Sequence, residues 1–208
     1  MSGNTPAAPR DAGAPPEPGT LFAGKRLFWL VMEPMVLLDL WSKAWVFGLL
    51  AESNGGHFNL RSEHRVFHTR LVSFDLVNYF NPGTIWGMFQ DYNQPLRYLR
   101  LVAIGVILWF VYRTPRAATF TKLALGLIMA GALGNLYDNF LHQLDPAVYS
   151  SKQIAEFSGA VRDFLHFHRV PNWDFPAFNV ADSCITVGAS TLFLILLGHR
   201  DPQPGNKA

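Results

Sequence analysis

The stretch TFTKLALGLIMAGALGNLYDNFL, residues 119–141, is apolar until Asn135 and Asp138 appear near its end. A helix of this length, rising 1.5 Å per residue, crosses the hydrocarbon core of a bilayer, which is about 30 Å thick. Asn135 and Asp138 share one helix face, and Gly131 and Gly134 would let a neighbouring helix approach closely. The stretch predicts a membrane-spanning helix with a polar cluster at one end. The cluster is either part of a functional site or a hydrogen-bond network that only joins helices.

Other apolar stretches of similar length lie on both sides of this one. The first contains Asp39 and Lys43, whose i, i+4 spacing favours mutual pairing and a structural role. We therefore predict a mainly α, integral membrane protein with four transmembrane helices. The predicted spans are about 27–51, 97–113, 119–141 and 179–199, within a membrane domain of residues 25–200. Residues 1–24, rich in Pro, Ala and Gly, are predicted to form a disordered N-terminal tail. Residues 201–208 are predicted to form a short C-terminal tail.

The composition agrees with a membrane protein and argues against other classes. Half of the residues, 50%, are hydrophobic and only 15% are charged. The net charge of +2 comes without a dense Lys/Arg block, so we expect no nucleic-acid partner. The single cysteine, Cys184, excludes an internal disulfide and a Cys-rich metal site, and neither it nor Ser183 has a neighbouring base that would indicate a nucleophile.

Two polar segments, 52–96 and 142–177, separate the predicted spans. We expect the first to be folded outside the membrane, with short strands such as 64–75. Four spans place both termini on one side, where Lys and Arg near the span ends predict the cytoplasm. Both polar segments would then lie on the outer face, where their residues can meet those at the ends of the spans.

Asp163 and Asp182 are the candidate catalytic pair. Pro171 and Pro176 prevent one continuous helix between them, so the chain can fold back and bring the carboxyl groups together. Two adjacent carboxylates share one proton near neutral pH, which is the arrangement of an aspartic protease. Structural roles remain open: Asp182 could be the third residue of a helix capped by Asn179, and Asp163 a solvated loop acid paired with Arg162 or Arg169.

His166 and His168 could face the same way in a strand near Asp163 and Asp174, which is one way to build a metal site. No HExxH or HxxEH spacing supports it. We therefore predict no metal ligands.

Several motifs together resemble the lipoprotein signal peptidases, also called signal peptidase II. They are LDLWSKAW (38–45), NYFNPGTIWGMF (78–89), GALGNLYDN (131–139), VRDF (161–164) and PAFNVADSCITVG (176–188), and the resemblance covers about residues 27–199. It implies that Asp163 and Asp182 are the catalytic aspartates. It also implies that the surrounding polar positions bind substrate or support the site: Asn81, Gly83, Asn135, Asp138 and Asn179, with Asp39 and Lys43 supporting the fold.

The resemblance further implies an aspartic endopeptidase of the bacterial inner membrane, with its site at the periplasmic face. It would remove the signal peptide from diacylglyceryl-modified prolipoproteins by cleaving before the lipidated cysteine. This mechanism needs no cofactor, and we expect a monomer whose partners are the substrate and membrane lipid. The alternative is a non-catalytic membrane scaffold or a transporter-like protein, in which the polar groups pair helices or line a pathway.

Two features depart from the family pattern. Asn139 stands where family members usually carry Arg, and we hypothesise that Arg162 or His142 replaces that cation. The connection after Asp138, residues 142–160, is also longer than usual.

Overall fold

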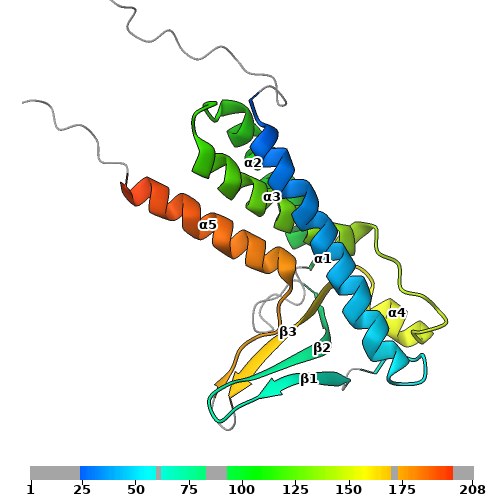
Figure 1. Ribbon diagram of the computed structural model, residues 1–208. Coiled ribbons are helices and arrows are strands. Elements are labelled where there is room, and N and C mark those ends of the chain that lie inside the picture. The colour runs from blue at the N-terminus through cyan, green and yellow to red at the C-terminus, as the bar shows by residue number, and fades with distance from the viewer. Residues whose placement is uncertain (1–23, 60–61, 83–92, 170–172, 199–208) are drawn as a thin grey trace, which may run out of the picture.

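The computed structural model describes residues 24–59, 62–82, 93–169 and 173–198. Helices dominate, and a small sheet and a short helix lie at one end of the helical bundle (Figure 1). The elements in chain order are α1 (Arg26–Glu52), β1 (Glu63–His68), β2 (Ser73–Asn81), α2 (Asn93–Arg113), α3 (Thr119–Phe140), α4 (Ser151–Phe157), β3 (Val161–Arg169), β4 (Trp173–Asp174) and α5 (Val180–Gly198).

Within the part of the chain that the structure describes, three helices are long and apolar enough to cross a membrane: α1, α3 and α5, with 27, 22 and 19 residues. The chain is therefore a multi-pass membrane protein. Helix α2 covers the remaining stretch for which the sequence predicts a span, and it packs against α3. It is not one of these three helices, and its crossing of the membrane is a proposal.

Small residues let the helices of the bundle approach one another closely. A side chain at Gly131 would overlap the backbone oxygen of Ala181 in α5, and one at Gly134 would overlap the Asp39 carboxylate of α1. The close approach expected at these two glycines is confirmed. It brings the polar end of α3 against the beginning of α5 and the middle of α1.

The sheet is antiparallel with the strand order β1-β2-β3-β4. The short strands expected around 64–75 are confirmed, and there are two of them, because the chain reverses between β1 and β2. Thr69 accepts hydrogen bonds from the backbone N–H groups of Leu71 and Val72 and donates one to Val72 O, which closes a turn between β1 and β2. The strand β2 then continues to Asn81.

An apolar core holds the sheet against the end of α1. It includes Phe47, Phe80 and Phe164, from α1, β2 and β3. The connection 142–160 contributes α4, whose Phe157 stacks on Phe80 with ring centroids 4.9 Å apart. The long connection therefore covers the core that anchors β3.

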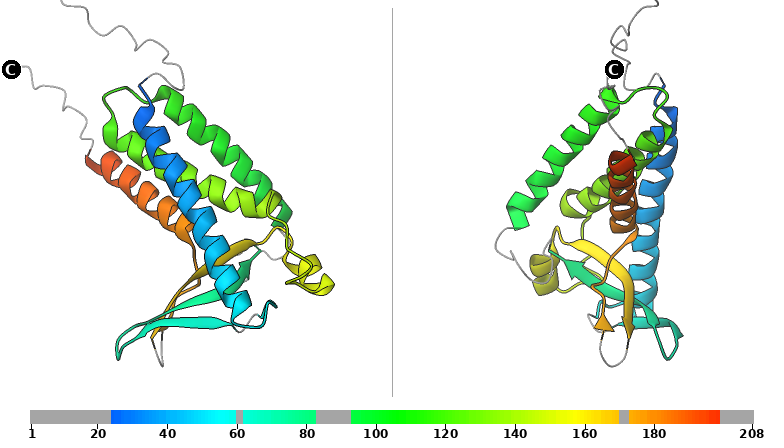
Figure 2. Two further views of the ribbon diagram at one scale, coloured as in Figure 1. Left: turned by 45° about the vertical axis from the view of Figure 1, so that its right-hand side comes forward. Right: turned by 90° about the vertical axis from the view of Figure 1, so that its left-hand side faces the viewer.

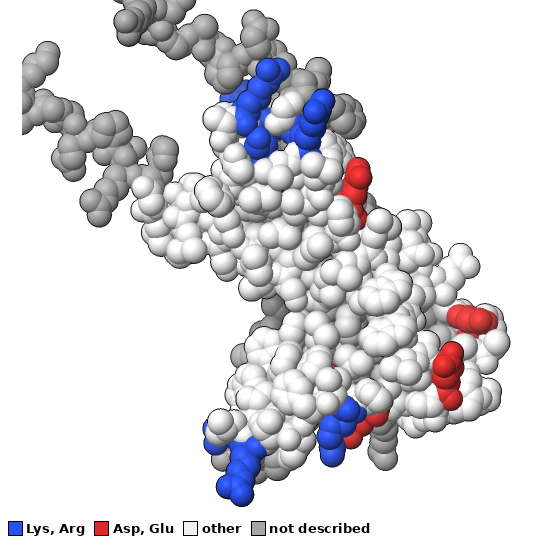
Figure 3. Space-filling view, in the orientation of Figure 1, with Lys and Arg blue, Asp and Glu red and all other residues white. Residues whose placement is uncertain are grey.

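The start of α1, the α2–α3 connection and the end of α5 lie at the end of the bundle away from the sheet (Figure 2). Lys and Arg side chains gather at that end, and others lie at the sheet end of the molecule (Figure 3). At the end away from the sheet, Lys25 donates to the backbone oxygen of Thr114, and Lys122 donates to that of Arg116 at 2.6 Å. These contacts tie the beginning of α1 to the α2–α3 connection.

Candidate active site

Asp182 lies in the first turn of α5 and forms a reciprocal cap with Asn179. Its backbone N–H donates to Asn179 Oδ1 at 2.9 Å, and its Oδ2 accepts the Asn179 backbone N–H at 3.2 Å. The capping role expected for these two residues is confirmed. The cap uses only Oδ2 of the Asp182 carboxylate. The other oxygen, Oδ1, accepts a 2.9 Å hydrogen bond from the side-chain amide of Asn135.

Asp163 lies within β3 and is only 1% exposed. The alternative in which it is a solvated loop acid is therefore wrong, because β3 pairs with β2 over this stretch and the next residue, Phe164, enters the apolar core. Its carboxylate accepts a 3.0 Å hydrogen bond from Asn81 and a 2.6 Å bond from Asn179.

Backbone pairing after the prolines brings Asp182 back to β3. The backbone N–H of Leu165 donates to Phe178 O at 2.8 Å, and that of Phe178 donates to Leu165 O at 3.0 Å. This bridge places Asn179 beside β3 and starts α5 next to Asp163. The chain thus folds back as Pro171 and Pro176 predict, and the two hydrogen bonds between Leu165 and Phe178 hold the returning segment against β3.

The environment of Asp163 favours its protonated form. Burial and the nearby charge of Asp182 raise the pKa of Asp163 to about 8, although the hydrogen bonds from Asn81 and Asn179 and the charge of Lys43 act in the opposite direction. The two carboxyl groups therefore interact electrostatically.

A buried layer of charges supports the pair from the bundle side. Lys43 lies 2.7 Å from Asp39 and 3.0 Å from Asp138, and it donates to Asn135 Oδ1 at 3.1 Å. Asp39 in turn accepts the Ala181 backbone N–H at 2.9 Å, beside Asp182. The pairing predicted for Asp39 and Lys43 is confirmed, and it extends to the polar end of α3.

Arg162 and His142, the two residues considered as replacements for the missing cation, differ in charge. Arg162 donates from Nε and Nη2 to Asp138 Oδ1 at 3.0 and 2.7 Å, so it carries a charge against that carboxylate. Burial and the charge of Arg162 lower the pKa of His142 to about 4, so this imidazole is neutral at pH 7 and supplies no cation.

Sequence reasoning missed Arg100. This side chain, from α2, donates to Asn139 Oδ1, and the Asn139 side-chain amide donates to Gly159 O at 2.8 Å. Asn139 thus joins α2 and α3 to the turn that precedes β3. No local sequence signal links residues 100 and 139, because the contact is between separate helices.

Two expectations remain: Gly83 as a site residue, and a metal site at His166 and His168. Gly83 lies outside the described residues. His166 and His168 do not join Asp163, because alternation along β3 places them on the other face. They meet Asp75 of β2 instead, and His166 also contacts Asp174 at 2.6 Å.

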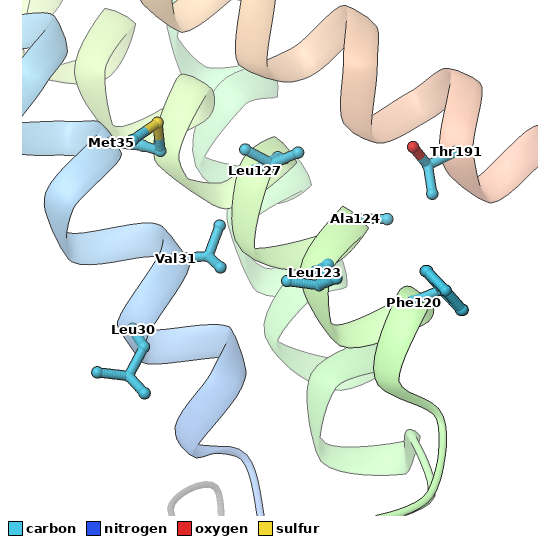
Figure 4. Close-up of a pocket in the computed structure, with 8 residues that line it drawn as sticks. All are labelled: Leu30, Val31, Met35, Phe120, Leu123, Ala124, Leu127 and Thr191. Carbon is cyan, nitrogen blue, oxygen red and sulfur yellow. The ribbon is translucent and has the colours of Figure 1, made fainter.

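An apolar pocket lies between α1, α3 and α5, nearer the other end of the bundle (Figure 4). Thr191 is its one lining residue with a polar side chain among the described residues, and it lies nine positions after Asp182 on α5. The other lining residues are Leu30, Val31, Met35, Phe120, Leu123, Ala124 and Leu127. The described lining is apolar and offers no groups for acid–base catalysis.

The family model for Signal peptidase (SPase) II matches residues 31–198, which includes every described residue of the candidate site. The chain belongs to the signal peptidase II family. A lipoprotein signal peptidase of Yersinia pseudotuberculosis serotype O:1b is 32% identical over 187 residues, covering 88% of this chain and 92% of that protein. A second, from Neisseria meningitidis serogroup B (strain MC58), is 32% identical over 184 residues, covering 87% and 94%.

Solved structures share the fold of this chain. A bacterial membrane enzyme determined by the in meso method at 2.3 Å resolution has a TM-score of 0.63 and 20% identity, covering 87% of this chain and 93% of its own. Another, at 1.9 Å, has a TM-score of 0.59 and 21% identity, covering 83% and 94%. The chain is thus a membrane peptidase of the signal peptidase II family with the fold of known membrane enzymes.

Proposed function

We propose that this chain removes the signal peptide from diacylglyceryl-modified bacterial prolipoproteins, and that Asp163 and Asp182 are its catalytic aspartates. The family and the names of the relatives support the substrate class. The observation that carries the catalytic assignment is the amide network between the two carboxyl groups. Asn179 donates to Asp163 while its backbone binds Asp182, and Asn135 donates to Asp182.

The two carboxyl groups perform different parts of the hydrolysis. Asp182, which is half-buried, accepts a proton from a water molecule as its oxygen attacks the carbonyl carbon before the lipidated cysteine. Asp163, which holds a proton at neutral pH, donates it to the carbonyl oxygen and gives a tetrahedral diol. Asp182 then protonates the leaving nitrogen, the C–N bond breaks, and a diol proton returns to Asp163. The products are a carboxylic acid and a free amine, and both aspartates recover their starting states.

The neighbouring polar residues position this pair. Asn81 and Asn179 hold Asp163, and Asn135 holds Asp182. Asp138 and Lys43 neutralise one another behind Asn135. We assign substrate binding or site support to Asn81, Gly83, Asn135, Asp138 and Asn179, and structural support to Asp39 and Lys43.

We further propose that α2 is a fourth span and that both termini are cytoplasmic. Support comes from the cations gathered at the end of the bundle where α1 begins (Figure 3), as expected for cytoplasmic loops. The sheet and the aspartates would then lie at the periplasmic face of the inner membrane. The diacylglyceryl chains of the substrate could stay in the bilayer while its peptide bond reaches the carboxyl groups, which aligns the reactants without a soluble cleft. The protein would act as a monomer, without a metal or cofactor in the reaction.

The deciding experiment is cleavage of a diacylglyceryl-modified prolipoprotein by the purified protein in detergent. Wild type should cleave the lipidated substrate and leave the unlipidated precursor intact, and Asp163→Asn or Asp182→Asn should abolish cleavage while the protein stays folded. Full activity in either variant would contradict the catalytic assignment. A folded wild type without activity would favour a scaffold or transporter-like role.

A further inference from the structure

The sheet carries a polar cluster on the face of β3 that does not hold Asp163. Strand pairing places Asp75 opposite His166 and Ser73 opposite His168. The alternate positions bear aromatic rings: Phe74 stacks on Phe167 with centroids 4.6 Å apart. The histidines and Asp75 are therefore gathered on one side of the sheet by register, with a packed aromatic layer on the other.

Asp75 is 1% exposed, and neither of its carboxylate oxygens has a hydrogen-bond partner among the described residues. The nearest nitrogen atoms of basic side chains lie beyond the roughly 2.7–3.2 Å that is typical of N–H···O hydrogen bonds. Arg65 Nε lies 3.7 Å from Oδ1, on a side chain that is 60% exposed, and His168 Nδ1 lies 3.3 Å from Oδ2. Burial of an ionised carboxylate is costly unless it is paired or coordinates a metal. The site thus contains an acceptor without a close donor.

The geometry of the three side chains fits a metal ion. One oxygen of Asp75 and one ring nitrogen from each of His166 and His168 all lie within 4.8 Å of one another. The two imidazole rings are nearly parallel, with centroids 5.2 Å apart. Asp174 contacts His166 Nε2 at 2.6 Å and fixes that ring, as carboxylates commonly do for histidines in metal sites.

We propose that Asp75, His166 and His168 bind a divalent transition-metal ion of the Zn²⁺ class. Two imidazoles and one carboxylate are a ligand set that suits zinc, and a fourth position would remain for water. The ion would join β2 to β3 three residues after Asp163, so it would brace the strand that carries this aspartate. It takes no part in the proposed hydrolysis, which runs on the opposite face. The sequence suggested Asp163 as a possible partner of these histidines. The partner proposed here is instead Asp75, which lies far from the histidines in the chain.

The test is titration of the full-length, EDTA-treated protein in detergent with ZnCl2, followed by calorimetry. Wild type should bind one equivalent per chain, and Zn²⁺ should raise its Tm. Asp75→Asn, His166→Gln and His168→Gln should each weaken binding by more than the roughly 10- to 100-fold typical for loss of an outer-shell partner. His64→Gln, an exposed histidine on β1, is the matched control and should bind as wild type does.

Titration with CoCl2 provides a second measurement, because Co²⁺ absorbs visible light in a way that reports the nitrogen ligands. A spectrum that disappears in His166→Gln but persists in His64→Gln supports the site. Folded wild type without saturable Zn²⁺ binding, or unchanged affinity in all three ligand variants, overturns it. None of these measurements depends on peptidase activity, so their failure is distinct from failure of the proposed function.

Discussion

The side-chain amide of Asn179 donates a 2.6 Å hydrogen bond to Oδ1 of Asp163, across the junction between α5 and β3. Asn179 is also the residue that caps α5 through Asp182. One side chain thus sets both the start of the helix and the position of the strand carboxyl group. The stability of α5 and the geometry of the carboxyl pair are coupled through this residue.

Substitution of Asn179 should separate these two roles. Asn179→Ser keeps a good N-cap but loses the amide donor, so it should lose less stability than Asn179→Ala while kcat falls by about 10²-fold through misplacement of Asp163. Asn179→Ala loses both and should also lose about 1 kcal/mol of stability. Thermal unfolding and cleavage kinetics of both variants measure this. A Ser variant with wild-type kcat would show that the amide does not position Asp163.

Activity should fall on the alkaline side as Asp163 loses its proton. Its pKa is raised to about 8 by burial and by Asp182, and the proposed mechanism needs the protonated form. The logarithm of kcat/KM should therefore decrease with a slope of about −1 above pH 8, as for loss of a single proton. Kinetics between pH 6 and pH 10 test this, with circular dichroism as the control for folding. A flat profile through this range contradicts the assignment of the acid.

The same pKa shift makes the folding of this protein less favourable as pH rises. Between the ordinary pKa of an aspartate, near 4, and about 8, the unfolded chain has released a proton that folded Asp163 retains, so stability decreases with increasing pH. Asp163→Asn is neutral in both states and lacks this contribution. We expect its Tm advantage over wild type to grow from pH 5 to pH 9. Equal Tm differences at the two pH values would argue against the shift.

The sequence predicted the helices and the polar end of α3 because these depend on local patterns. An apolar run of bilayer length and an i, i+4 pair such as Asp39 and Lys43 are visible without tertiary structure. Asp182 was predicted at the start of a helix for the same reason, since its cap partner Asn179 lies three residues away.

Contacts between distant segments were not predictable. Asp163 changes from an expected loop acid to a buried strand residue only because β3 pairs with β2, and the bulge between Leu76 and Tyr79 sets which side chains share its face. Asp75 meets His166 through the same register. The contact between Arg100 and Asn139 joins two helices whose packing no local pattern specifies.

Loss of the Lys43 charge should destabilise the bundle. Lys43→Met would leave Asp39 buried beside Asp138 without its cation, which typically costs about 3–5 kcal/mol. Asp138 keeps its contact with Arg162, so most of the effect should come from Asp39. The double variant Lys43→Met, Asp39→Asn should recover part of the loss, and Lys152→Met, at an exposed position of α4, should have almost no effect on Tm. A wild-type Tm in Lys43→Met would show that the charge layer contributes little.

Replacement of Gly131 should disturb the packing of α3 against α5. The added methyl group would overlap the Ala181 backbone oxygen, and a backbone atom cannot move aside as a flexible side chain can. We expect Gly131→Ala to cost about 1–3 kcal/mol and to lower kcat, because Ala181 precedes Asp182 in the first turn of α5. Gly105→Ala in α2 is the matched control, since nothing lies within 4 Å of its added methyl group. Its Tm should be unchanged or slightly raised by the better helix propensity of alanine. If both alanine variants retain wild-type Tm and kcat, the α3–α5 contact does not hold Asp182 in place.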